Sequence, residues 1–182
     1  DINSFLQTIR KPFFGVFGGI KLDDKMPVIR SLAGKLDCIV LGSSIAVAFL
    51  HRFGFGVGDS VVTKDSDKVV DQFWDFVNQS GIKVIFPKDL VIGSSLTNER
   101  VKVLDIDFEK IISKEIVPMS ICEEKEGVYD IGEKSIEELK NIFGTAGSIF
   151  WNGPLGWAEK EKFAYGTLET AKLMSESKAV VL

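Results

Sequence analysis

Two lysines that follow a pair of glycines are the first residues here whose types and spacing could do chemistry. Gly18-Gly19 ends an apolar run, and Lys21 and Lys25 come next, four residues apart. Glycines at such a place let a ligand approach the backbone closely. If this segment is already helical, the two ammonium groups share a face and repel each other, and a bound phosphate would relieve this repulsion. The alternative is that Asp23 and Asp24 cap a helix and neutralise the lysines.

A second candidate turn is formed by Gly42, Ser43 and Ser44, which follow another apolar run and precede a helical stretch. Backbone N–H groups at this point could face a ligand. The same residues could equally be an ordinary helix start. The glycine-rich segment 54–58 resembles a dinucleotide fingerprint superficially, but it follows a predicted helix rather than a strand, so we interpret it as a plain loop.

A third candidate turn runs from Trp151 to Glu159. Asn152 brings a neutral amide to the predicted sheet edge. Glu159 could accept hydrogen bonds from a sugar hydroxyl, or it could be a favourable acidic charge in a first helical turn. Trp157 is more typical of a core or lid residue than of a platform for a base.

Other catalytic chemistries are excluded by what the sequence lacks. His51 is the single histidine and Cys38 and Cys122 are the two cysteines, so neither a histidine-rich metal site nor a disulfide scaffold is available. We interpret His51 as structural, and the cysteines as small buried hydrophobic residues in a reducing compartment. No nucleophile triad and no P-loop pattern occurs. The catalytic groups that remain possible are positioned cations, backbone amides and a metal brought by the ligand. Enzymes that transfer phosphoryl groups use this combination.

Length and composition limit the classes of protein to which these turns can belong. The chain has 182 residues and a formal net charge of -4, with a pI near 5.2. This length suits one domain, residues 1–182, and the acidic balance argues against nucleic acid as a partner. No apolar run reaches the ~18 residues of a membrane span, and the first residues lack a signal-peptide layout. We therefore expect a cytoplasmic protein without a membrane partner.

The elements that must position these turns alternate between strand and helix. Apolar runs predict strands at 13–17, 38–41, 84–86, 148–151 and 179–182. Helical spacing predicts helices at 25–36 and 45–53, from Asp65 or Ser66 to Gly81, from Ser135 on, and at 160–176. Ser135 and Glu138 match a capping box.

The middle of the chain departs from this alternation. Short strands are predicted at 90–92 and 101–104, residues 117–121 are ambiguous, and the charged residues 123–126 are interpreted as a solvated excursion. The whole pattern predicts an α/β fold, a doubly wound, mainly parallel, Rossmann-like sheet with helices on both faces. Ligands of such sheets bind beyond the carboxyl ends of the strands, here after Phe17, Leu41, Trp151 and Leu182.

Taken together, these motifs resemble those of one enzyme family. The segment Gly18-Gly19-x-Lys21-x-x-Asp24-Lys25, the turn Trp151-Asn152-Gly153-Pro154-x-Gly156 with Glu159, and Phe163-Ala164-x-Gly166-Thr167 resemble the phosphoglycerate kinase family in its C-terminal, nucleotide-binding half. The segments Val57-Gly58-x-Ser60, Phe86-Pro87-x-Asp89 and Tyr129-Asp130-Ile131-Gly132 also follow the family's order and spacing. The resemblance covers essentially the whole chain.

The resemblance implies an activity and a set of site residues. The family moves a phosphoryl group between 1,3-bisphosphoglycerate and ADP, which gives 3-phosphoglycerate and ATP with Mg²⁺, and its usual form is a monomer. Lys21 would be the catalytic lysine that follows the transferred group, Lys25 would hold the α-phosphate, and Asn152 would lie by the nucleotide phosphates. Glu159 would bind the ribose hydroxyls. The remaining nucleotide-binding residues would be Gly18, Gly42, Ser43, Ser44, Val61, Val128, Tyr129, Pro154, Gly156 and Trp157.

Several departures from the family pattern bear on this expectation. The family usually has three glycines in the second turn, so the hydroxymethyl groups of Ser43 and Ser44 are expected to enter the adenine slot. Tyr129 and Trp157 replace small aliphatic residues, which predicts a narrower slot or a tilted base, and they leave an unusual nucleotide preference open.

The chain ends at Leu182, where the family continues with a glycine-rich turn whose aspartate serves the metal. The N-terminal half that binds phosphoglycerate is also missing, so no metal ligand is assigned within this chain. We therefore expect the polypeptide alone to bind nucleotide weakly and not to turn over. The alternative is a catalytically degenerate nucleotide-binding or regulatory relative of the family.

Overall fold

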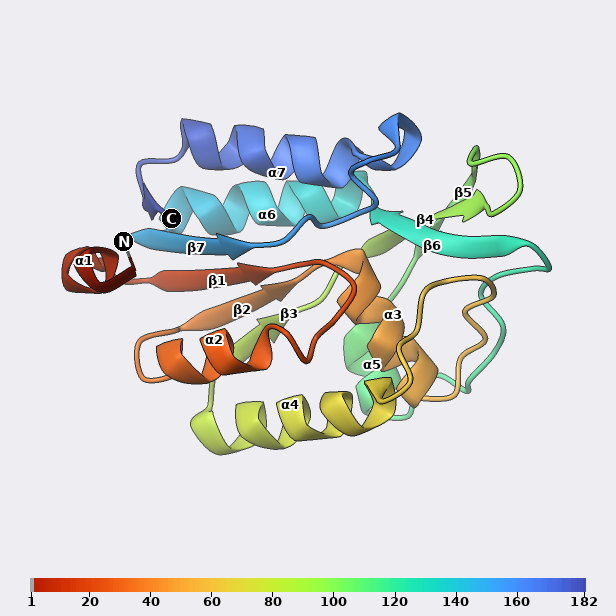
Figure 1. Cartoon of the computed structure of the whole chain (residues 1–182), viewed down its shortest axis with the longest axis horizontal. Coiled ribbons are helices and arrows are strands. Elements are labelled where there is room, and N and C mark those ends of the chain that lie inside the picture. The colour runs from red at the N-terminus through yellow and green to blue at the C-terminus, as the bar shows by residue number, and fades with distance from the viewer. Residues whose placement is uncertain (1) are drawn as a thin grey trace.

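A five-stranded parallel sheet forms the centre of the molecule. The computed structural model describes residues 2–182, with side chains from residue 4 on. The sheet order is β3-β2-β1-β7-β8, and every neighbouring pair is parallel (Figure 1). Its strands are β1 (Phe13–Phe17), β2 (Cys38–Leu41), β3 (Lys83–Ile85), β7 (Ser148–Asn152) and β8 (Val180–Val181).

The central strands are apolar on both faces because each face is covered. Along β1, Phe13 and Phe17 belong to one buried cluster, whereas Phe14 and Val16 belong to a second. Alternate side chains of a strand point to opposite faces, so the two clusters lie on opposite sides of the sheet. The continuous apolar runs in the sequence therefore indicated doubly covered strands correctly.

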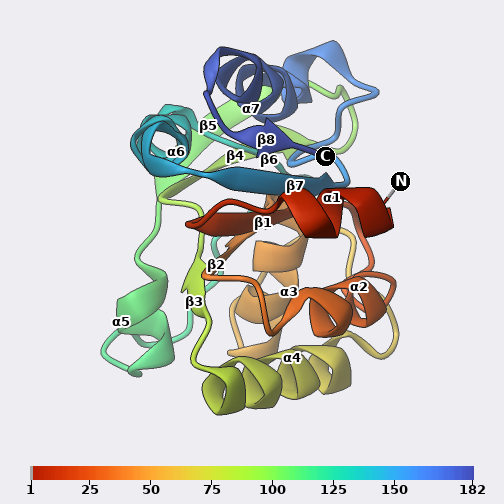
Figure 2. The same ribbon diagram turned by 90° about the vertical axis from the view of Figure 1, so that its left-hand side faces the viewer.

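Helices cover both faces, as a doubly wound fold requires. The helices are α1 (Ile2–Thr8), α2 (Met26–Leu32), α3 (Ser43–Arg52), α4 (Ser66–Ser80), α6 (Glu133–Thr145) and α7 (Tyr165–Glu176), the last preceded by a 3-10 turn at Glu161–Phe163. Figure 2 shows α6 and α7 on one side of the sheet and α2, α3 and α4 on the other. The predicted α/β class is confirmed.

A second, smaller sheet occupies the irregular middle of the chain. The strands β4 (Asp89–Ser94), β5 (Arg100–Asp105) and β6 (Glu126–Ile131) are antiparallel in the order β5-β4-β6, and the short helix α5 (Phe108–Ile112) follows β5. Neither β6 nor α5 was predicted as an element. The ambiguous segment 117–121 is irregular and forms a single bridge, between Ser120 and Gly56.

Reading residues 123–126 as a solvated excursion was wrong for Glu126. Residues 123–125 are exposed, but Glu126 is buried and begins β6. Its carboxylate accepts a hydrogen bond from Glu123 N at 2.8 Å and lies 3.3 Å from the Lys102 ammonium. The backbone hydrogen bond lowers the pKa of Glu126 despite burial.

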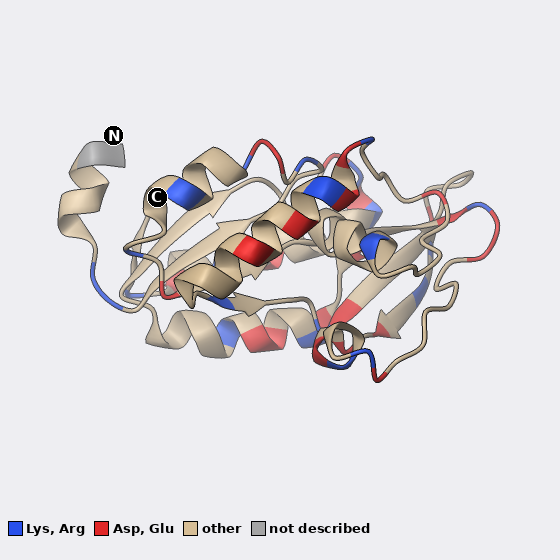
Figure 3. Ribbon diagram, turned by 90° about the horizontal axis from the view of Figure 1, so that it is seen from below, with Lys and Arg blue, Asp and Glu red and all other residues tan. Residues whose placement is uncertain are grey.

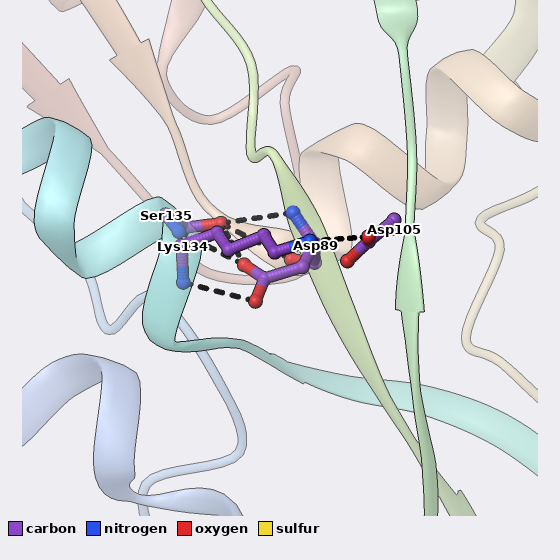
Figure 4. Close-up of polar contacts among 4 residues, drawn as sticks. All are labelled: Asp89, Asp105, Lys134 and Ser135. Carbon is purple, nitrogen blue, oxygen red and sulfur yellow. Dashed lines mark hydrogen bonds and ion pairs between the residues drawn. The ribbon is translucent and has the colours of Figure 1, made fainter.

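Two predicted helix starts also differ. Helix α2 begins at Met26 after a turn, with Lys25 at the N-cap position and no side-chain cap, so Asp23 and Asp24 do not cap it. The capping box at Ser135 was wrong, because α6 begins two residues earlier at Glu133. Figure 4 shows that Ser135 instead bonds Asp89 of β4, at 2.6 Å.

The charged surface carries both signs. Asp67, Asp71 and Asp75 are exposed along α4, and Figure 3 shows this row of acidic residues with basic residues nearby. His51 lies on α3 and is half-exposed, with its Nδ1 atom 2.9 Å from the Asp67 carboxylate. Over the described residues, no helix combines the length and apolar character that crossing a bilayer requires.

Candidate functional site

The candidate site lies where the order of the large sheet reverses. From β1 the chain continues to β2 and β3 on one side, whereas β7 and β8 lie on the other. The loops that follow β1 and β7 therefore diverge and leave a crevice at the carboxyl ends of these strands. A cavity of about 690 Å³ opens there. It is lined by Gly19, Ile20, Lys21, Asp24, Lys25, Ser44, Val47, Asp59, Val61, Ser95, Val128, Tyr129, Pro154, Gly156, Trp157 and Glu159.

Glycines allow the turns beneath the cavity to pack closely against each other. Gly18 N donates to the Asn152 carbonyl at 2.9 Å, and Gly19 N donates to the Pro154 carbonyl at 2.8 Å. A Cβ atom on Gly18 would lie 2.0 Å from the Pro154 oxygen, and one on Gly42 would lie 3.1 Å from Leu155 Cα. Gly18 and Gly42 are therefore needed for close packing of the turns and do not themselves line the cavity.

Both lysines line the cavity, and one of them is bound to the amide of Asn152. Lys25 Nζ donates to Asn152 Oδ1 at 2.7 Å, and Lys21 lines the same cavity. Helix α2 begins only at Met26, so the condition for a shared helical face of the two ammonium groups is not met. The contact between Lys25 and Asn152 follows from the parallel pairing of β1 with β7, which aligns Phe17 with Asn152.

The two serines of the second turn have different surroundings. Ser43 is the first residue of α3 and is fully buried, and its Oγ donates to the Leu155 carbonyl at 2.8 Å. The expectation that both hydroxymethyl groups enter the slot is therefore wrong for Ser43. Ser44 lines the cavity.

Aromatic residues form the apolar wall. The Tyr129 ring lies 5.3 Å from Trp157 and 5.0 Å from Phe163, and Trp157 stacks on Phe163 with an interplanar angle of 6°. Phe163 is fully buried and so fixes both rings. Burial, helped by the charge of Asp59, raises the pKa of Tyr129, which stays a neutral phenol.

A buried carboxylate stands behind this wall. Asp130 accepts hydrogen bonds from Ile131 N at 2.8 Å and Gly166 N at 2.9 Å. A Cβ atom on Gly156 would lie 2.1 Å from Asp130 Oδ1, so the loop after β7 packs directly on this carboxylate. Burial raises the pKa of Asp130 to about 7. In the sequence, Asp130 is visible only as part of the motif Tyr129-Asp130-Ile131-Gly132, and that motif does not indicate that its side chain is buried.

The described residues offer no protein-held metal cluster. No group of three or more His, Cys, Asp or Glu side chains with suitable placement occurs among them. Cys38 and Cys122 are buried, and burial raises the pKa of their thiols to about 12 and about 11, which disfavours the thiolate that a metal requires. Asp24, Asp59 and Glu159 are the carboxylates that line the cavity, and they do not form such a group.

Fold and site together define a class. The chain is a doubly wound α/β protein whose main cavity lies at the switch point of a parallel sheet and is lined by two lysines, one of them bound to an amide, and by aromatic residues.

The chain belongs to the phosphoglycerate kinase family. The family profile described as "Phosphoglycerate kinase" matches residues 1–182. Phosphoglycerate kinase of Chloroflexus aurantiacus is 34% identical over 178 residues, which are 98% of this chain and 42% of that protein. Phosphoglycerate kinase of Aquifex aeolicus is 32% identical over 173 residues, 95% of this chain and 41% of that protein.

A solved structure agrees with this assignment. The phosphoglycerate kinase structure from Coxiella burnetii superposes with a TM-score of 0.80 at 25% identity, over 99% of this chain and 45% of that one. The chain thus spans less than half the length of the relatives it matches.

Proposed function

We propose that this chain is the nucleotide-binding lobe of a phosphoglycerate kinase, which transfers a phosphoryl group between 1,3-bisphosphoglycerate and ADP to give 3-phosphoglycerate and ATP. The observation that carries the proposal is that Lys21 and Lys25 line the cavity at the switch point, with Lys25 bound to Asn152. Phosphoglycerate would be bound by a part of the protein outside these residues. Two lobes that close on each other would then align the two substrates.

Each of these residues takes a separate role in this proposal. Lys25, oriented by Asn152, binds the α-phosphate, and Lys21 follows the phosphoryl group as it moves. The charge that spreads over the phosphoryl oxygens is met by ammonium groups already in place, so no covalent intermediate is needed. Glu159 accepts hydrogen bonds from the ribose, and the base lies against Val61, Val128, Tyr129 and Trp157, near Ser44, Pro154 and Gly156.

Mg²⁺ would enter this site with the nucleotide. The phosphate oxygens and water supply most ligands of Mg²⁺ in such sites, and the ion neutralises charge on the phosphates. In this chain, Asp24 would be the carboxylate next to the cavity lysines that faces the bound complex.

Substitution of Lys21 tests the catalytic role. In the full-length protein, Lys21→Ala should lower kcat by about 100-fold or more and change KM for nucleotide little, because Lys21 acts mainly on the transferring group. The exposed Lys172 of α7 lies outside the cavity, so Lys172→Ala is the matched control and should keep parental rates. Turnover of Lys21→Ala within a few-fold of the parent would show that the assigned role is wrong.

A second candidate function is a nucleotide-binding or regulatory relative without catalysis. The rings of Tyr129 and Trp157 favour it, because both line the cavity where the base would lie and are larger than the aliphatic residues usual in the family. A full-length protein that binds nucleotide and shows no phosphoryl transfer would support this alternative.

A further inference from the structure

The cavity holds a carboxylate to which the proposed function gives no role. Asp59 and Ser95 both line the cavity, and Ser95 Oγ donates a hydrogen bond to Asp59 Oδ2 at 2.6 Å. Asp59 lies in the loop after α3, and Ser95 directly follows β4. Two segments far apart in the chain thus place a hydroxyl and a carboxylate together on one wall.

This pair is held at the start of β6, whereas the lysines lie on the turn after β1. Asp59 N donates to the Glu126 carbonyl at 2.7 Å, and Ser95 N donates to the Lys125 carbonyl at 2.8 Å, so both residues sit at the start of β6. From there β6 runs past Val128 to Tyr129, whose carbonyl accepts a hydrogen bond from Trp157 N at 2.7 Å. Backbone contacts thus lead from the Asp59–Ser95 pair, here called the acidic end of the cavity, along β6 to the turn after β7, and from Pro154 of that turn to Gly19.

The Asp59 carboxylate keeps capacity to accept further hydrogen bonds. Among the described residues, no lysine, arginine or histidine nitrogen lies within 4.0 Å of it, and Oδ1 accepts no hydrogen bond. The Lys102 ammonium, which is near β6, pairs with Glu126 instead. A ligand that reaches this end thus meets a negative acceptor that no protein cation neutralises.

We propose that Asp59, oriented by Ser95, makes this site select guanine over adenine nucleotides. The Watson–Crick edge of guanine carries two adjacent donors, N1–H and the N2 amino group, which match the two oxygens of a carboxylate. On the same edge adenine presents N1 as an acceptor, which a carboxylate repels. Stacking on Tyr129 and Trp157 serves either base, so the polar contact decides between them. This inference rests on the proposed nucleotide site; it leaves the proposed phosphoryl transfer unchanged and makes GDP, in place of ADP, the preferred nucleotide of this chain.

Calorimetry on the purified full-length protein tests the inference. GDP should bind about tenfold more tightly than ADP, the discrimination expected of one bidentate contact, and IDP, which lacks the N2 amine, should fall between them. Asp59→Asn should reduce the GDP-to-ADP preference to within about threefold, because an amide no longer offers two acceptors. Asp75→Asn changes an exposed aspartate of α4 outside the cavity and should leave the preference intact.

The outcomes separate this inference from the proposed function. If neither GDP nor ADP binds, the nucleotide site itself is wrong. If ADP binds as tightly as GDP, or if Asp59→Asn keeps the full preference, the site stands and the selection by Asp59 is overturned. Should Asp59→Asn fail to fold, Ser95→Ala decides instead. Loss of the orienting hydroxyl should weaken GDP binding several-fold and leave ADP binding unchanged, and an unaltered ratio overturns the inference.

Discussion

Asp130 supports the loop that forms part of the cavity wall, and its protonation affects the stability of the fold. Its carboxylate is fully buried, accepts two backbone N–H groups and faces Gly156 and Gly166 without an ion-pair partner among the described residues. Burial dominates, so the pKa of Asp130 rises from 3.8 to about 7. Protonation of this one residue therefore links pH to the packing of the loop that carries Trp157.

The elevated pKa of Asp130 predicts a pH dependence of stability. Between about pH 4 and about pH 7 the native state keeps a proton that the unfolded state has released. The contribution of Asp130 to the free energy of unfolding therefore falls as pH rises through this window, by on the order of 3 kcal/mol. Urea unfolding of the parent and of Asp130→Asn at about pH 5 and about pH 8 measures it.

The difference between parent and variant isolates Asp130 from the other titrating groups. The parent should lose stability relative to Asp130→Asn as pH rises, because the variant carries no titrating group at this position. Parallel pH profiles for the two proteins would mean that Asp130 is ionised in both states, contrary to this account.

At the scale of elements, α6 depends on a cap that comes from another element. Asp89 of β4 is buried and accepts hydrogen bonds from Lys134 N at 3.0 Å and from Ser135 N at 2.9 Å. Asp89 also accepts a bond from Ser135 Oγ (Figure 4). The same Ser135 oxygen accepts a hydrogen bond from Lys88 N at 3.0 Å. The small sheet and α6 are thereby fixed to each other, and β6 with its Tyr129 lies in the same sheet.

Removal of this cap should destabilise the protein. Asp89→Ala loses an N-terminal cap and leaves buried donors without an acceptor, so the free energy of unfolding should fall by about 2–3 kcal/mol. Asp105→Ala is the matched control, because Asp105 forms an exposed ion pair with Lys134 in the same place and should cost less than about 0.5 kcal/mol. Urea unfolding compares them, and equal losses would contradict the tertiary cap.

At the scale of the whole molecule, the 182 residues form a cavity, although the chain spans less than half the length of the relatives it matches. The proposed nucleotide site lies entirely within this chain. Phosphoryl transfer between two substrates would also require binding residues for the second substrate and exclusion of water. We therefore expect the two properties to separate when this chain is studied by itself.

The isolated chain should be stabilised by nucleotide and remain without turnover. With Mg²⁺ and a purine nucleoside diphosphate at ten times its dissociation constant, binding contributes about 1.4 kcal/mol and should raise Tm by about 3 °C. A scan with Mg²⁺ alone is the control, since it separates nucleotide binding from a general ion effect. Phosphoryl transfer by the isolated chain at a rate near that of its full-length parent would refute the expectation.

Local sequence patterns predicted much of the large sheet and its turns. The apolar runs at 13–17, 38–41 and 148–151 predicted buried strands. Gly81 was predicted to end a helix, and it ends α4 in the left-handed backbone conformation, with a φ of 70°. The turns after these strands were expected to carry the site, because parallel strands present their carboxyl ends at a common edge. The meeting of Lys25 with Asn152 followed from that rule and from β1–β7 pairing.

Tertiary structure decided whatever depended on contacts between distant segments. The sequence alone could not show that Ser43 turns to Leu155, that Asp89 caps α6, or that Asp59 and Ser95 meet beside β6. The physical reason is that periodicity reports which face of an element is buried, whereas the partner of a polar side chain depends on which strands become neighbours. In this chain those partners define the acidic end of the cavity.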